Sequence, residues 1–131
     1  MSSSLSDILS ALKNGVIAIN GLISSYSATL LSQGALTTAY TTLYTTPSTS
    51  RVYVNDICVC NTSGSALTVY ISLVPLGGTA GASNAIFYNT SIPAYSTMQW
   101  TGTQVLNSNS TIQAYASSTS CTVTISGRIS S

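Results

Sequence analysis

The chain has 131 residues and a mass of 13.5 kDa, which is the size of one domain. It carries three basic and two acidic residues, contains no His, and has a net charge of +1. A Ser-His-Asp triad and a His-bearing zinc site are therefore excluded, and the two carboxylates, Asp7 and Asp56, lie in unrelated segments. We expect no enzymatic activity, no metal and no cofactor.

The same composition restricts the partners. Three cations cannot neutralise a row of phosphates, so we expect no nucleic acid. The longest nearly apolar run, 16–23, is far shorter than the ~20 residues that span a bilayer, and no cationic signal-peptide start precedes it, so we expect synthesis in the cytoplasm and no membrane partner. With 44% hydrophobic residues the chain should fold, and its nearly uncharged surface should favour assembly.

Residues 4–33 carry the one long helical pattern, which Ser4 can cap and Gly34 can end. Its apolar residues alternate at spacings of four and three, the pattern of a coiled-coil seam. The predicted seam consists of Leu5, Leu9, Leu12, Val16, Ile19, Ile23, Tyr26 and Leu30. Isoleucine occupies both kinds of seam position at the centre of the repeat, and this favours a coiled coil of three helices over one of two. We therefore predict that 1–34 form an oligomerising and anchoring helix in a homotrimer.

One alternative for this helix is that it packs as a single amphipathic helix onto its own β domain. The flanks of the seam lack the Glu and Lys pairs of soluble coiled coils. Gly15 and Gly21 each weaken a helix by roughly 1 kcal/mol relative to alanine. The helix thus needs tertiary or quaternary contacts in either interpretation.

After Gly34 the sequence changes to short alternating runs rich in Thr, Val, Ile and Tyr, separated by turn residues, which predicts a β domain over 35–131. The predicted strands are 36–46, 51–60, 66–74, 84–91, 95–101, 103–106, 110–116 and 121–129. No helical pattern lies between them, so we expect antiparallel pairing in a β-sandwich of the jelly-roll type. Strands 51–60 and 66–74 are predicted to form a hairpin, and the glycine-containing segment 75–83 a turn rather than a phosphate site. The residues expected to point inward are Val69, Ile71, Leu73, Val123 and Ile125.

Two further sets of side chains allow more than one interpretation. Cys58, Cys60 and Cys121 are an odd number, so they do not form a fully paired framework; we favour free thiols in the core, with disulfides between subunits as the alternative. The eight tyrosines and Trp100 suit a core, an interface or a stacking surface for sugars, and the near absence of charged partners argues against the last.

Several segments in both parts of the chain carry a resemblance to a known family. In the N-terminal part these are Leu5-Ser6-Asp7-Ile8-Leu9, Lys13-Asn14-Gly15-Val16 and Ala18-Ile19-Asn20-Gly21-Leu22. In the β part they are Tyr44-Thr45-Thr46-Pro47, Ile57-Cys58-Val59-Cys60-Asn61-Thr62, Ile71-Ser72-Leu73-Val74-Pro75, Gly77-Gly78-Thr79-Ala80-Gly81 and Ser83-Asn84-Ala85-Ile86. These segments resemble those of small virion structural proteins of tailed bacteriophages. The resemblance covers most of the chain, and its motifs are turn and core patterns rather than catalytic signatures.

This resemblance implies a many-copy structural component of a virion, whose partners are copies of itself and other virion proteins such as capsid, neck or tail proteins. A trimeric capsid decoration or head-fibre protein is the favoured hypothesis, because the chain is short and lacks long shaft repeats. A neck or tail fibre component and a receptor- or glycan-binding module are the alternatives.

Overall fold

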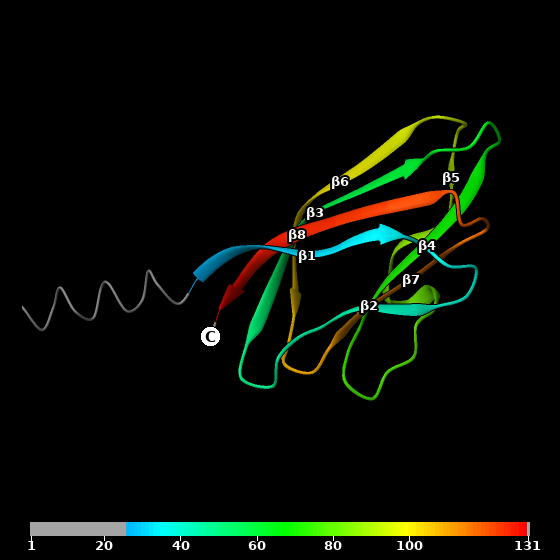
Figure 1. The fold of residues 1–131 in the computed structure, drawn as a ribbon. Helices are drawn as coiled ribbons and strands as arrows, with labels where there is room; N and C mark the ends of the chain where they lie inside the picture. The colour runs from blue at the N-terminus through cyan, green and yellow to red at the C-terminus, as the bar shows by residue number, and fades with distance from the viewer. Residues whose placement is uncertain (1–25, 131) are drawn as a thin grey trace, which may run out of the picture.

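The computed structural model describes residues 26–130, which form two four-stranded sheets packed face to face (Figure 1). The strands are β1 (Tyr26–Ala35), β2 (Thr41–Thr45), β3 (Arg51–Asn61), β4 (Leu67–Val74), β5 (Ala85–Ile92), β6 (Thr97–Leu106), β7 (Thr111–Ala116) and β8 (Cys121–Ser130), with one short 3-10 helix, η1 (Ala82–Asn84). Sheet A has the order β1-β8-β3-β6 and sheet B the order β2-β7-β4-β5. No helix within 26–130 has the length and apolar character needed to cross a membrane.

The strand order is that of a jelly roll. β1 pairs with β8, β2 with β7, β3 with β6 and β4 with β5, all antiparallel. Such nested pairing arises when one long antiparallel ribbon is wrapped so that alternate segments fall into opposite sheets. The predicted fold class, mainly β with an antiparallel sandwich, is confirmed for the described residues.

The core lies between the sheets and is built from the inward residues of each strand. Val69, Ile71, Val123 and Ile125 are buried as predicted, and Leu73 packs against the core while partly exposed. Further buried members come from every strand except β2 and from the connection after β1. They include Leu31, Leu36, Val52, Val54, Ile57, Val59, Phe87, Ile92, Leu106, Ile112, Ala114 and Ala116. Alternate residues of each strand therefore supply the core, as period-two patterning requires.

Ser72 and Val74 are also buried, although alternation places them on the outer face of sheet B. The turn predicted over 75–83 accounts for this, because it lies back over β4: the Ser72 hydroxyl donates to the Gly81 carbonyl at 3.3 Å. At the start of this segment Gly77 has φ 80 and Gly78 N–H donates to the Pro75 carbonyl, which closes a tight turn.

The predicted helix is wrong at its C-terminal end. Residues 26–33 lie in strand β1. Gly34, which was predicted to end the helix, lies within the same strand and pairs with Val123 of β8. The spacing of four between Tyr26 and Leu30 fits one face of a helix, but four is even, so it fits one face of a strand as well. Pairing with β8 decided between the two, and sheet A begins at Tyr26 rather than after residue 34.

The predicted hairpin of 51–60 with 66–74 is also wrong, because β3 belongs to sheet A and β4 to sheet B. The buried Asn61 fixes the crossing between them. Its Nδ2 donates to the carbonyls of Ser65, Ile92 and Pro93 at 2.7–3.1 Å, and its Oδ1 accepts from Ser63 N and Oγ. A side chain that is this fully bonded holds the chain in a crossover instead of a hairpin turn.

Two other boundaries differ from the prediction. The segment 36–46 is a connection followed by the short β2, and the predicted strands 95–101 and 103–106 are one strand, β6. Gly102 does not end β6, because a β-bulge between Thr101 and Gln104 accommodates it opposite Asn55.

Candidate functional site

The predicted oligomerisation seam leads into an edge of sheet A. Its residues Leu5, Leu9, Leu12, Val16, Ile19 and Ile23 lie outside the described part of the chain. Tyr26 and Leu30 lie on β1, the edge strand, and Leu30 is 56% exposed. Tyr26 pairs with Ser130, so the chain enters the domain at the end where β8 finishes (Figure 1).

A line of backbone irregularities crosses sheet A near this end, and we call it the crease. The register shifts in β1 between Leu30 and Ser32, and in β3 between Val54 and Asp56. Gly127 of β8 lies on the same line and is buried, and a Cβ there would overlap the Tyr53 carbonyl oxygen. Glycine thus permits a close approach of β8 to β3, and β3 and β6 change direction sharply at the crease (Figure 1).

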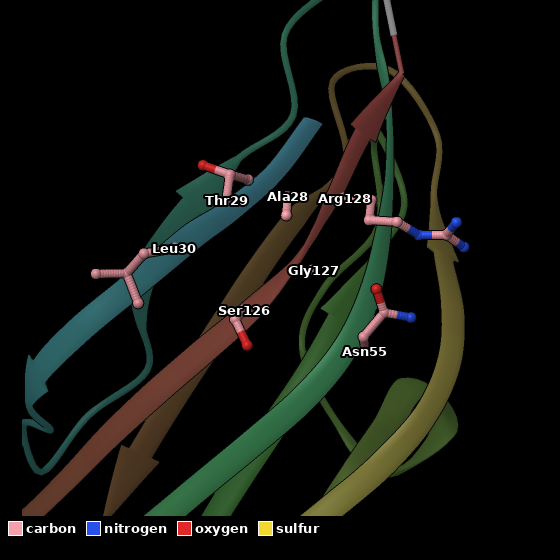
Figure 2. A pocket seen from close by; sticks show the side chains of 7 residues that line it. All are labelled: Ala28, Thr29, Leu30, Asn55, Ser126, Gly127 and Arg128. Carbon is pink, nitrogen blue, oxygen red and sulfur yellow. The ribbon is translucent and has the colours of Figure 1, made fainter. Parts of the chain in front are cut away.

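The crease opens a shallow hollow of about 470 Å³ on the outer face of sheet A (Figure 2). Its lining consists of Ala28, Thr29, Leu30, Asn55, Ser126, Gly127 and Arg128. Asn55 Nδ2 donates to the Gly102 carbonyl at 3.2 Å, and the Arg128 guanidinium lies 5.4 Å from the centre of the Tyr53 ring. The lining offers hydroxyls and one permanent cation but no general base, so it can bind a partner but not activate a nucleophile.

The outer face of sheet B carries a row of four tyrosines, one from each part of the sheet in spatial order: Tyr40 just before β2, Tyr115 on β7, Tyr70 on β4 and Tyr88 on β5. Tyr115 and Tyr70 are cross-strand partners whose rings are stacked, 4.3 Å apart and 4° from parallel. Tyr40 meets Tyr115 edge-on at 4.6 Å, and Tyr88 meets Tyr70 edge-on at 5.3 Å. We call this set the tyrosine row.

A β-bulge places the last ring of the row. Thr90 opposes Val69 and Phe87 opposes Ile71, so both Tyr88 and Asn89 face Tyr70. Asn89 has φ 50, an uncommon conformation for a residue other than glycine, and its Oδ1 accepts from the Tyr70 hydroxyl at 2.9 Å. Burial raises the pKa of the Tyr115 phenol, and the neighbouring Tyr70 adds to the rise, so the Tyr115 phenol stays protonated at neutral pH.

The three cysteines are free in the structure, and only one lies in the core. Cys121 is buried between the sheets, whereas Cys58 and Cys60 are half-buried on the outer face of β3, so the prediction of core thiols is wrong for these two. Burial raises the pKa of the Cys121 thiol to about 11, with a smaller contribution from Cys60. Within residues 26–130 no group of His, Cys, Asp and Glu could hold a metal ion.

No protein-family model and no curated protein matches the chain. Solved structures with a similar arrangement include a chain from the structure of the infectious bursal disease virus Gx strain, with 15% sequence identity and a TM-score of 0.43 over 79% of this chain and 30% of that one. A second is the infectious bursal disease virus VP2 subviral particle, with 13% identity and a TM-score of 0.41 over 79% of this chain and 31% of that one. The chain thus spans less than a third of the length of these viral chains.

The sequence shows eight tyrosines but not that four of them form a row. Tyr70 alternates with the apolar Val69 and Ile71, which assigns it to the outer face. Tyr115 lies between two alanines, Ala114 and Ala116, and alternation assigns it to the outer face as well. The order of strands in the sheet, which brings the four rings together, is not encoded in those local patterns.

Proposed function

We propose that the chain is a non-enzymatic structural component of a tailed-phage virion, displayed as a homotrimeric capsid decoration or head-fibre protein. The observation that carries the proposal is the geometry of the entry point: the apolar repeat Leu5–Ile23 leads directly into β1 at the edge of a jelly roll whose own core is closed. A repeat with this spacing can gather subunits by burying its apolar seam between them.

The position of the entry point supports display of the β domain. Tyr26 and Ser130 are paired at one end of sheet A. The connections 36–40, 62–66, 93–96 and 117–120 meet at the opposite end, which we call the distal end; there Leu36 N–H donates to the Cys121 carbonyl and Thr62 N–H to the Ser120 carbonyl. A domain held through residues 1–25 would project this distal end away from its attachment.

The surface chemistry supports a repeated structural role. Among the described residues the charged side chains are Arg51, Asp56 and Arg128, all on sheet A, and Asp56 accepts a hydrogen bond from Gln99 Nε2 at 2.8 Å. The described residues hold one carboxylate and no histidine, so neither sheet face pairs two such groups for proton transfer. Little charge repulsion opposes close packing of copies.

The test is the mass of the full chain in solution, measured by light scattering for the wild type and for the double variant Ile19→Asp/Ile23→Asp. Burying one Ile contributes roughly 1.5 to 3 kcal/mol, and in a trimer the variant would place six like charges in one seam. We expect a trimeric wild type, a monomeric variant, and loss of attachment of the variant to virions.

The matched control is Ala11→Asp/Ile17→Asp, which adds the same charge at positions outside the seam and should remain trimeric. A wild type that is monomeric at high concentration, or a seam variant that still assembles and decorates particles, would refute the proposal in favour of a helix packed on its own domain. Copy number per virion then separates a capsid position from a neck or tail position.

A further inference from the structure

The tyrosine row is a surface that sheet B does not require for its own closure. Its rings lie on the outer face, opposite the core, and Tyr88 is 55% exposed. One face of the Tyr70 ring stacks on Tyr115, and Tyr88 lies at 86° to Tyr70. Two perpendicular rings in contact cannot cover both faces of either ring. Tyr70 therefore leaves at least one face of the Tyr88 ring uncovered.

The bulge in β5 gives this exposed ring a defined orientation. Phe87 and Ile92 both point into the core although their separation is odd, which requires one extra residue between them. The strand accommodates it with Asn89 at φ 50, and the result is that a ring and an amide reach Tyr70 together.

The polar groups around the row are neutral. Sheet B has no charged side chain, since Arg51, Asp56 and Arg128 all belong to β3 and β8. Within the described residues Asn89 Nδ2 donates to no other group, and Asn89 is exposed, so this N–H pair points to solvent beside the Tyr88 ring. The row thus combines an open aromatic face, phenol hydroxyls and a free amide donor without any ion.

The scarcity of charged partners, which in the sequence argued against a sugar site, excludes only ligands that need ion pairs. The features of the row match one class of ligand that needs none. A sugar ring has an apolar C–H face that packs on an aromatic ring, and hydroxyls that bond to phenols and amides. An anionic glycan or nucleic acid would need cations, which lie on the other sheet. A protein partner would favour a broad apolar patch, whereas the polar side chains of Thr68, Asn89 and Ser91 border this narrow row.

We propose that the tyrosine row binds neutral carbohydrate, with the exposed face of Tyr88 stacking on one sugar ring and Asn89 Nδ2 donating to a hydroxyl of the same sugar. The inference goes beyond the structural role proposed above and does not depend on it. Tyr40 begins the row beside the distal connection 36–40, so a domain attached through residues 1–25 would present the row to its surroundings.

The experiment uses the full-length chain on an array of neutral hexose and N-acetylhexosamine oligosaccharides together with sialylated, uronic and sulfated counterparts, followed by calorimetric titration with the best neutral oligosaccharide. We expect binding to neutral probes only. Tyr88→Ala should weaken the affinity by about tenfold or more, and Tyr88→Phe, which keeps the ring, by clearly less.

The matched control is Tyr95→Ala, which removes a tyrosine that is 77% exposed on a distal connection outside the row and should bind like the wild type. Three results would overturn the inference: no neutral oligosaccharide bound at millimolar concentration, binding restricted to charged glycans, or equal affinity of Tyr88→Ala and wild type. A change of oligomeric mass in Tyr88→Ala would likewise overturn it, by assigning the row to a contact between subunits.

Discussion

Replacing Gly127 with alanine tests whether the crease of sheet A depends on the close approach of β8 to β3. An added Cβ would overlap the Tyr53 carbonyl oxygen and lie 3.0 Å from the Tyr53 carbonyl carbon and 3.2 Å from the Val54 Cα. All three atoms are backbone, so no rotation of a side chain relieves the overlap. The two strands must move apart where Val54 and Gly127 are paired.

The cost follows from that movement. Separating the strands weakens one or two ladder hydrogen bonds, each contributing about 1 kcal/mol, and overpacking a tight site adds about 1–3 kcal/mol. We expect Gly127→Ala to lower the free energy of unfolding by about 3 kcal/mol, out of a total of about 5–15 kcal/mol for a domain of this size. The melting temperature should fall by roughly 10–20 °C.

The assay is thermal and urea unfolding followed by circular dichroism, with Gly81→Ala as the control. At Gly81 a Cβ meets no atom within 4 Å, and the backbone is extended with φ 176, so this variant should differ from wild type by less than about 0.5 kcal/mol. If Gly127→Ala and Gly81→Ala melted within about 2 °C of each other, the reasoning on the crease would be wrong.

Three further predictions concern Asn61 and the cysteines. Asn61→Ala should cost about 2–4 kcal/mol in urea unfolding, because three carbonyls lose their donor, whereas the exposed Asn107→Ala should change little; equal stability of the two variants would contradict the assigned crossover role. The Cys121 thiol has a pKa raised from 9.0 to about 11, so the unfolded chain ionises first and stability should fall as pH rises from about 9 to 11, with a smaller fall in Cys121→Ala; an identical pH dependence in both proteins would refute this. At pH 8 an alkylating reagent should label Cys58 and Cys60 in the folded protein and Cys121 only after unfolding, as read by mass spectrometry.

The sequence by itself determined the kind of domain and most of its strands. Alternating residues bounded by Gly, Pro, Asn and Ser predict β-strands whatever their partners, because the period of two is a property of the single extended chain. For the same reason Val69 and Ile71 could be assigned to the core and Tyr70 to the outer face. The near absence of charge, which limits both chemistry and repulsion, is likewise a property of composition alone.

The tertiary structure decided the partners of the strands, and with them the candidate sites. The segment after Asn61 looks like a hairpin turn, but whether it closes a hairpin or crosses between sheets depends on carbonyls from 92 and 93, far along the chain. The spacing from Tyr26 to Leu30 suits helix and strand equally, and only the hydrogen bonds offered by β8 select the strand. The tyrosine row needs four strands in the order β2-β7-β4-β5, which nested long-range pairing sets and local periodicity does not encode.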